Sequence, residues 1–429
     1  MPTTTPLAPS TKGIRLAHPA TAASLIGRRI DDPAFAWPLL TLDDEALTHN
    51  IKTAAQVCAS RGVHHAPHVK THMSKPIWQR QADAGAWAAT VASPNQLRTV
   101  LGWGVKRAFL ANELVDSRDA DWLQLALESD PELEVWLQID SEAGLSVLTR
   151  AFGDSPARHR LGILIEYGVA GGRTGLRTSA EVVALARATV AAGLRLRGVT
   201  GYEGPIAGHA DPASLAAVAA WCADLRAVAE QVRPLVAQAL GDGVPLTISA
   251  GGSAYLDIIL DELPADATTQ VIVRSGAYVT HDHGHYAEVD PWARIPGAPE
   301  LIPAIRVWGQ VLSAPEPGLA LVGLGRRDVS FDLDLPFPLR ARRPDASGSG
   351  RLGGRLGEPW DLRPADARVV ELNDQHAFVR FNPQTPAPNL QPGDVIEFGI
   401  SHPCTTLDKW RIAAITNSDV VTDIYPLDF

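Results

Sequence analysis

Short segments rich in β-branched residues alternate with longer segments whose apolar residues recur at helical spacing, and this alternation limits the folds open to the chain. The helical spacing is clearest in residues 44–62, 178–194 and 211–232. Alternation of this kind is typical of βα units that build a parallel sheet. The candidate strands are residues 39–43, 65–71, 89–93, 107–113, 133–140, 161–168, 195–203, 246–252 and 269–278.

About eight βα units within roughly 250 residues favour a closed (β/α)8 barrel over an open sheet. A doubly wound sheet of the Rossmann type is the weaker alternative, because no Gly-x-Gly-x-x-Gly run follows the first candidate strand. We therefore expect an α/β protein in which residues 38–298 form a TIM-like barrel.

The composition and periodicity of the sequence change after about residue 300. Segments rich in Val and Ile, separated by Pro and Gly, replace the helical runs and predict a β-domain over residues 299–429. Residues 340–366 form an insertion rich in Gly, Arg and Pro, which we expect to be a surface loop of low order. Residues 1–37 are expected to pack on the β-domain.

Composition favours a small-molecule partner. A formal net charge of -10 argues against a nucleic-acid surface, which needs Lys and Arg to neutralise phosphates. No segment has the ~20 consecutive apolar residues that span a bilayer, and the first residues lack the pattern of a signal peptide. Three cysteines are too few and too scattered for a disulfide framework, so we expect a cytoplasmic protein without nucleic-acid or membrane partners.

Residues 64–75 contain four histidines and two lysines in an otherwise acidic chain. Lys70 lies near the end of a candidate strand, with His68 and His72 at alternate positions on either side. A lysine held in this way predicts an amine used for covalent chemistry. The alternative is a set of polar side chains on one solvent-exposed loop.

Other polar groups and glycines follow the candidate strands, where barrels place their active sites. Glu113 ends one strand and Glu203 another, and glycine-rich turns are typical of anion binding near helix N-termini. Together with a lysine, this set predicts a phosphorylated cofactor bound as an imine, although each turn, arginine or tyrosine could also be purely structural. The predicted cofactor-binding residues are His68, Lys70, Arg173, Tyr202, Ser249, Gly251, Gly252, Ser253, Gly276 and Tyr278.

His402 and Cys404 lie two residues apart in a β-rich context, so strand alternation would place both on one face. Imidazole and thiolate suit zinc, and two protein ligands leave coordination positions open, as catalysis requires. The alternative is a half-buried strand whose histidine is simply hydrogen-bonded. Upstream, Asp374 and His376 could face the substrate, support the site or form a hairpin turn; we predict that His376 is a catalytic residue in addition to Lys70.

The motifs PHVKTH, GGRTG, GYEG, SAGGS, RSGAY, NDQHAF and ISHPCTTLDKWR occur in this order. They resemble the fold-type III pyridoxal phosphate (PLP) enzymes of the D-serine dehydratase and D-threonine aldolase family, from about residue 38 to the C-terminus. The resemblance implies a barrel of alanine-racemase type followed by a β-domain, Lys70 as the Schiff-base lysine, and His402 and Cys404 as metal ligands. It also implies a homodimer with the active site near the interface.

His-Pro-Cys at residues 402–404 is typical of dehydratase members of this family, whereas aldolase members place an aspartate two residues after the histidine. We therefore expect a lyase that uses PLP and zinc, or another divalent ion, to convert D-serine-like 3-hydroxy amino acids to a 2-keto acid and ammonia. The alternatives are an aldolase that forms glycine and an aldehyde, and a non-catalytic PLP carrier. Residues 92–97 and the insertion at 340–366 depart from the family pattern.

Overall fold

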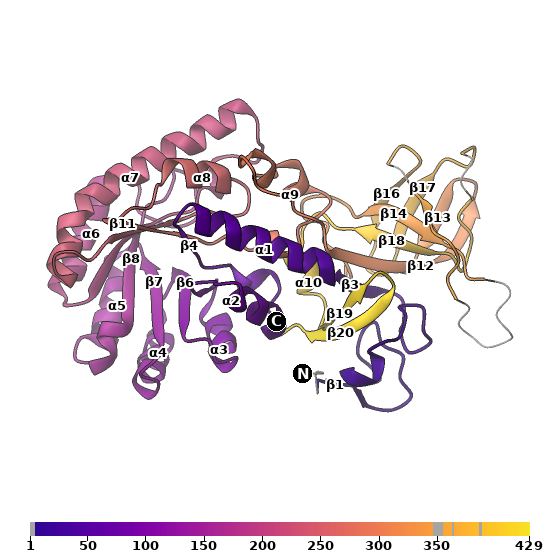
Figure 1. Cartoon of the computed structure of the whole chain (residues 1–429), viewed down its shortest axis with the longest axis horizontal. Helices are drawn as coiled ribbons and strands as arrows, with labels where there is room; N and C mark the ends of the chain where they lie inside the picture. The colour runs from indigo at the N-terminus through magenta and orange to yellow at the C-terminus, as the bar shows by residue number, and fades with distance from the viewer. Residues whose placement is uncertain (1–4, 346–354, 363, 386–387) are drawn as a thin grey trace.

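The computed structural model describes residues 5–345, 355–362, 364–385 and 388–429. Two bodies lie side by side along its longest axis, one built from strands surrounded by helices and the other built almost entirely from strands (Figure 1). The helical body spans the middle of the sequence, and the β-rich body combines the N-terminal and C-terminal segments (Figure 1).

Eight parallel strands form the helical body, in the order β4-β11-β10-β9-β8-β7-β6-β5. The two edges of this curled sheet meet through a parallel bridge between His68 and Thr90. The predicted barrel is therefore confirmed. The strands are β4 (His64–His65), β5 (Ala89–Val91), β6 (Arg107–Glu113), β7 (Glu134–Ile139), β8 (Leu161–Glu166), β9 (Arg195–Thr200), β10 (Leu246–Ala250) and β11 (Thr269–Val273).

Helices cover the outside of this barrel, and their N-termini carry the capping groups that the sequence offers. The Asp43 carboxylate accepts the Ala46 N–H, and Thr178 with Glu181 forms a capping box. The helices are α1 (Asp44–Ser60), α2 (Lys75–Asp83), α3 (Pro94–Gly102), α4 (Ser117–Ser129), α5 (Glu142–Phe152), α6 (Ser179–Ala191), α7 (Pro212–Leu240), α8 (Leu256–Glu262) and the short α9 (His285–Glu288).

Among the described residues, α7 alone is long and apolar enough, by length and composition, to cross a membrane. Its buried side chains, such as Val218, Leu225 and Val232, face the barrel, and the helix contacts β9 and β10. A long helix that covers a barrel passes the same test, so α7 is weak evidence for a membrane span.

Large apolar side chains fill the barrel interior. Phe109, Trp136, Leu164 and Ile272 lie on four different strands and form one buried cluster with Ala66 and Ala88. Residues at alternate positions, such as Leu110 and Val135, belong instead to the larger core under the helices. The polar carboxyl ends of the strands therefore lie above a tightly packed layer of apolar side chains.

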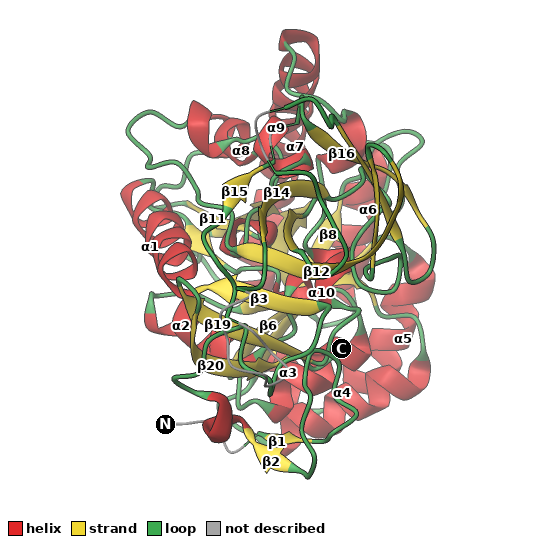
Figure 2. Ribbon diagram, turned by 90° about the vertical axis from the view of Figure 1, so that its right-hand side faces the viewer, coloured by secondary structure: helices red, strands yellow, loops and turns green. Residues whose placement is uncertain are grey.

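The β-rich body is a largely antiparallel sheet with the order β15-β14-β18-β12-β13-β17-β16, to which β3, β19 and β20 are added at β12. The predicted C-terminal β-domain is thus confirmed (Figure 2). Its strands are β12 (Ile305–Glu316), β13 (Leu319–Val322), β14 (Phe337–Arg342), β15 (Trp360–Asp361), β16 (Ala367–Leu372), β17 (Ala377–Phe381), β18 (Val395–Gly399), β19 (Ile412–Asn417) and β20 (Val420–Pro426).

The structure differs from our expectation at residues 39–43, which we expected to be the first barrel strand. They form β3 (Leu39–Asp43), which pairs with β12 and β19 in the β-domain. A short apolar strand that is buried on both faces carries no local signal of which sheet it joins. The barrel therefore starts at β4, after α1.

Part of the N-terminal segment lies against the β-domain, as Leu25 and Ile30 share a buried cluster with Trp308 and Ile424. Its first strands are β1 (Pro6–Leu7) and β2 (Ala20–Thr21). Within the predicted insertion, residues 340–342 and 360–361 belong to β14 and β15, so these parts are ordered strands. Residues 346–354 and 363 of the insertion lie outside the described residues.

Candidate functional site

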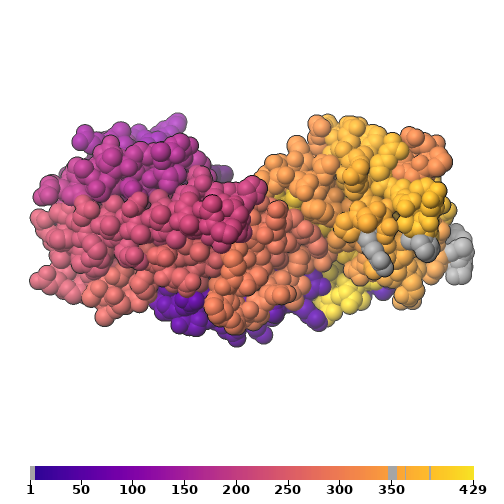
Figure 3. All heavy atoms as spheres, turned by 90° about the horizontal axis from the view of Figure 1, so that it is seen from above, coloured from indigo at the N-terminus to yellow at the C-terminus, as the bar shows by residue number. Residues whose placement is uncertain are grey.

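A cavity of about 220 Å³ lies at the carboxyl ends of the barrel strands. Most of its lining comes from the loops after β5 to β11, while Cys404 comes from the β-domain. A space-filling view shows the surface hollowed where the two bodies meet (Figure 3). Nine predicted site residues line this cavity: His68, Lys70, Arg173, Tyr202, Gly251, Gly252, Ser253, Gly276 and Cys404.

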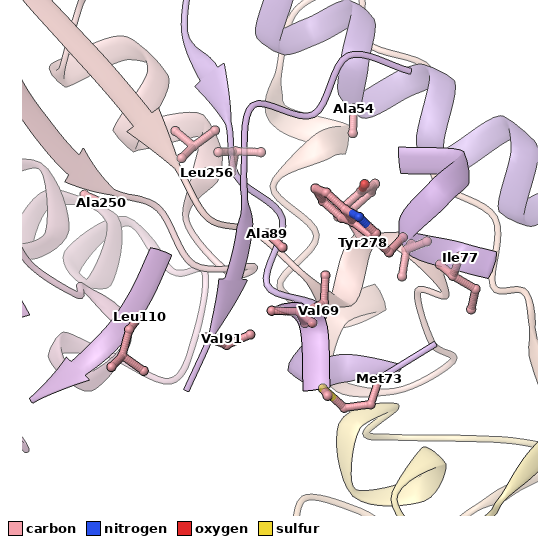
Figure 4. Packing of buried hydrophobic residues seen from close by; sticks show 14 of the residues in the cluster. Ala54, Val69, Met73, Ile77, Ala89, Val91, Leu110, Ala250, Leu256 and Tyr278 are labelled. Carbon is pink, nitrogen blue, oxygen red and sulfur yellow. The ribbon is translucent and has the colours of Figure 1, made fainter. Parts of the chain in front are cut away.

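Lys70 lies in a short 3-10 turn, Val69–Thr71, rather than at the end of a strand. Val69 and Met73 on either side are buried in the hydrophobic core, which fixes the turn (Figure 4). Among the described residues that line the cavity, Lys70 is the only lysine. Burial lowers the pKa of its amine; the charge of Cys404 opposes this shift, and Arg173 and Arg274 add to it.

His72 does not accompany His68 on the cavity side, because the turn rotates it into the core. Its Nε2 is 3.3 Å from Oε1 of Gln81, and its Nδ1 accepts the Ser74 N–H. Gln81 Nε2 also donates to the hydroxyl of Tyr278, which is buried next to the turn (Figure 4). Tyr278 is therefore outside the cavity lining, contrary to our prediction that it binds the cofactor.

The two glycine-rich turns predicted to hold a phosphate line the same part of the cavity. The N–H groups of Gly276 and Ala277 point to the Ser253 hydroxyl, at 3.3 and 3.1 Å. A Cβ at Gly276 would lie 2.4 Å from the backbone oxygen of His68, so only glycine fits there. These donors converge on one point, as a phosphate oxygen requires.

Two of the predicted phosphate donors are already occupied. The N–H groups of Gly251 and Gly252 donate to the carboxylate of Glu203, which is fully buried, and burial raises the pKa of that carboxyl group. Ser249 is also fully buried, donates to the Ile272 carbonyl and does not line the cavity. The anion-binding groups that remain are Ser253 and the N–H groups of Gly276 and Ala277, whose partner is the neutral Ser253 hydroxyl rather than a carboxylate.

Two arginines border the cavity, and sequence reasoning selected only one of them as a site residue. The Arg173 guanidinium lies 4.8 Å from the centre of the Tyr202 ring, a cation–π contact. Arg274 is buried; it donates to the hydroxyls of Thr200 and Ser249 and to the Gly201 carbonyl. A charged residue that follows the strand TQVIV directly was the signal that could have identified Arg274.

His402 and Cys404 lie next to the turn that carries Lys70. The Cys404 sulfur is 3.3 Å from the Thr71 hydroxyl, and Nδ1 of His402 is 2.7 Å from a carboxylate oxygen of Asp332. The pair does not lie on a strand as we expected, because Cys404 begins the short helix α10 (Cys404–Leu407). A turn still brings the two side chains together.

The contact between His402 and Cys404 shifts the pKa of each side chain. Burial opposes charge on His402, but Cys404 and Asp332 outweigh it and raise the pKa of the imidazole to about 9. Burial would raise the pKa of the Cys404 thiol, but His402, Thr71 and Lys70 outweigh it and lower that pKa. The site therefore favours a thiolate, the form of cysteine that binds metals.

His376 does not reach this cavity in the single chain. It is exposed in the turn between β16 and β17, where neighbouring Asp374 pairs with Arg327 at 3.3 Å. The structure therefore does not place His376 beside Lys70. Tyr286 lines the cavity instead, with its ring 6.5 Å from that of His402, and sequence reasoning did not select it.

Two family models match the chain, one to each body. The N-terminal domain of alanine racemase matches residues 42–243, and a serine dehydratase domain matches residues 304–416. The 3-hydroxy-D-aspartate aldolase of Paracoccus denitrificans strain Pd 1222 is 26% identical over 72% of this chain and 76% of that protein. Both halves of the molecule therefore have relatives among known enzymes.

Solved structures support the same likeness across both bodies. The D-threonine aldolase from Filomicrobium marinum matches with a TM-score of 0.75 and 21% identity, over 94% of this chain and 97% of that one. The D-threo-3-hydroxyaspartate dehydratase from Delftia sp. HT23 matches with a TM-score of 0.68 and 22% identity, over 91% and 97%. A cysteine-to-alanine variant of that dehydratase is described in a metal-free form. At these identities the structures show a shared fold.

Proposed function

The chain belongs to the fold-type III family of PLP-dependent enzymes, and from this premise we propose that it is a metal-dependent lyase of D-configured 3-hydroxy amino acids. In the reaction we propose, the β-hydroxyl leaves and the products are a 2-keto acid and ammonia. One observation carries the proposal: the Lys70 turn contacts the thiol of a His-Pro-Cys segment, through the 3.3 Å approach of Thr71 to Cys404. The amine of Lys70 and a pair of candidate metal ligands thus lie at the same end of the barrel.

The residues present fit the cofactor. Ser253, Gly276 and Ala277 offer a hydroxyl and two N–H groups at one end of the cavity, and Lys70 offers an amine on another side. PLP, when bound, supplies an electron sink for charge that develops at the substrate α-carbon. Because burial lowers the pKa of Lys70, a larger fraction of its amine is neutral and able to accept a proton near neutral pH.

The residues also fit a metal ion. His402 and Cys404 would hold it, and Asp332 fixes the ring orientation of His402 through the 2.7 Å contact to Nδ1, which leaves Nε2 as the ligand atom. Zinc, when bound, supplies a Lewis acid for a poor leaving group such as hydroxide. A thiolate ligand favours a softer ion of this kind over Mg²⁺.

The aldolase reaction is the second candidate, because two of the relatives described above are named as aldolases. The same amine and metal pair could serve carbon–carbon cleavage, with glycine and an aldehyde as products. The cysteine at position 404 favours elimination, since we expect aspartate there in the aldolases. A non-catalytic carrier is disfavoured, because a carrier needs no metal pair beside its lysine.

We further propose that the enzyme is a cytoplasmic homodimer. Phe331 and Leu333 on either side of Asp332 are 46% and 50% exposed, close to the metal pair. A partner subunit that covers them would also bury the entrance on this side. Light scattering after gel filtration should give twice the monomer mass; a monomer would contradict the dimer and leave the reaction to be tested separately.

The test of the reaction is an assay of the holoenzyme with D-serine, L-serine and D-threo-3-hydroxyaspartate, read for keto acid, ammonia and aldehyde. We expect keto acid and ammonia in equal amounts from D-serine and none from L-serine. Aldehyde and glycine would favour the second candidate. No turnover of any D-3-hydroxy amino acid, with PLP bound and zinc present, would overturn both.

A further inference from the structure

Three carboxylates meet on the barrel at a place that the proposed reaction does not use. Glu113 ends β6, Asp140 directly follows β7, and Glu166 ends β8. These are neighbouring parallel strands, so their carboxyl ends lie at one edge of the sheet. One side-chain oxygen from each residue lies within 4.8 Å of the others. We call these three residues the acid cluster.

No ion pair joins any of the three carboxylates to a basic side chain among the residues that the structure describes, and the buried Arg274 acts on Glu166 only through its charge, without a direct contact. Apart from the contact between Glu113 and Glu166, the hydrogen bonds that they accept come from neutral groups. Gln138 Nε2 donates to Glu113 over 3.3 Å, and the Gly175 N–H donates to Asp140 over 3.1 Å.

Burial makes this arrangement costly. Glu166 is only 5% exposed, and its Oε2 has no hydrogen-bond partner; Oε2 of Glu113 is buried and unpartnered as well. Burial, contact with Glu166 and the charge of Asp140 raise the pKa of Glu113 to about 9. An uncompensated buried carboxylate is strongly destabilising, so the cluster needs either a shared proton or a cation.

We propose that the acid cluster binds a divalent cation of the calcium type, separate from the ion expected at His402 and Cys404. All three ligands are carboxylate oxygens, the donor type that hard cations prefer, with no sulfur or imidazole nitrogen to favour zinc. Calcium binds oxygens at roughly 2.3–2.6 Å, so ligands across the ion are about 5 Å apart, which accommodates the observed spacing.

The ion would act on the cavity through Glu166, which belongs both to the acid cluster and to the cavity lining. Without an ion, this side presents negative charge to any substrate carboxylate. With an ion bound, its two positive charges offset most of the negative charge, and the ends of β6, β7 and β8 are tied together. The cation therefore stabilises the fold and keeps this side of the cavity from repelling anions.

Calorimetric titration of the PLP- and zinc-loaded enzyme with CaCl₂ tests the site. We expect one calcium per chain in the wild type, and binding at least tenfold weaker in Glu113→Gln and Asp140→Asn. Asp121→Asn is the matched control, because it removes the same charge from a half-exposed carboxylate on α4 that pairs with Arg150. This control should bind calcium like the wild type.

Thermal unfolding gives a second and independent measurement of calcium binding. Calcium should raise the Tm of the wild type and of Asp121→Asn but not that of the two cluster variants. The proposal is overturned if the folded wild type releases no heat with calcium, or if the cluster variants bind it equally well. In either case the carboxylates share a proton instead, and the proposed lyase reaction is unaffected because no substrate is used.

Discussion

Two clusters of ionisable side chains, each with at least one member in the lining of the same cavity, differ in how their charges are balanced. On the lysine side, which we define as Lys70, Thr71, His402 and Cys404, the amine, thiol and imidazole shift one another's pKa values and Asp332 anchors the imidazole. The acid cluster holds charges of one sign with unpartnered oxygens. The charges of the lysine side are thus balanced by its own residues, whereas the acid cluster needs a shared proton or the cation that we propose.

The largest effect is expected from removing the amine on the lysine side. Lys70→Ala should abolish turnover and the near-visible absorbance of bound PLP that borohydride removes, since no other described lysine lines the cavity. Lys75→Ala is the control, because Lys75 is exposed at the start of α2. A variant that keeps the reducible adduct would show that another amine carries the cofactor.

Loss of the thiol should stop elimination without unfolding the chain. Cys404→Ala, or chelation of the wild type, should lower the rate of keto acid formation roughly 100-fold or more, because a poor leaving group loses its Lewis acid. Added zinc should restore keto acid formation in the chelated wild type but not in Cys404→Ala. In Cys222→Ala, which alters α7 away from the cavity, elimination should persist. An undiminished rate in metal-free enzyme, verified by elemental analysis, would contradict the role of the pair.

A smaller effect is expected from Asp332→Asn, which keeps the shape of the side chain but weakens its hold on His402. Zinc affinity should fall on the order of tenfold, because the orienting partner of a histidine ligand is lost. Competition with a zinc indicator measures this change. Asp334→Asn, two residues along the same exposed loop, should leave the affinity unchanged. Equal affinities in both variants would show that Asp332 does not position the ligand.

The last effect is on stability rather than on turnover or metal binding, and it concerns the buried histidines next to the Lys70 turn. Burial lowers the pKa of His65 and of His72 to about 4, below the ordinary value of 6.5. Their neutral forms stabilise the fold fully above pH 6.5, and this contribution is lost as pH falls toward 4. The free energy of unfolding should drop by about 1.4 kcal/mol per pH unit for each histidine in that range. His72→Gln should show a shallower decline in urea titrations; an unchanged slope would contradict the assignment.

The sequence predicts the barrel and the β-domain because their signals are local. Alternation along strands and helical spacing depend on neighbouring residues, whereas the sheet joined by β3 depends on contacts with β12 and β19, hundreds of residues away. Lys70, His402 and Cys404 could be selected by residue type and spacing.

Side-chain direction was harder to predict at the site. The 3-10 turn at Lys70 turns His72 into the core, and Tyr278 bonds to Gln81 next to it, because a turn breaks the alternation that the prediction assumed. The acid cluster was missed since its members are far apart in sequence. The signal was nevertheless present: two successive candidate strands end in LANE and LQID, and the next one, LGILIEYG, contains an acidic residue near its end.

The central claim is that the lysine side performs elimination, and D-threonine tests it most directly because one substrate can follow either route. The holoenzyme with zinc should convert D-threonine to 2-oxobutanoate and ammonia in equal amounts, measured together by proton NMR and an ammonia assay. Glycine and acetaldehyde as the main products would contradict the account and assign the chain to carbon–carbon cleavage.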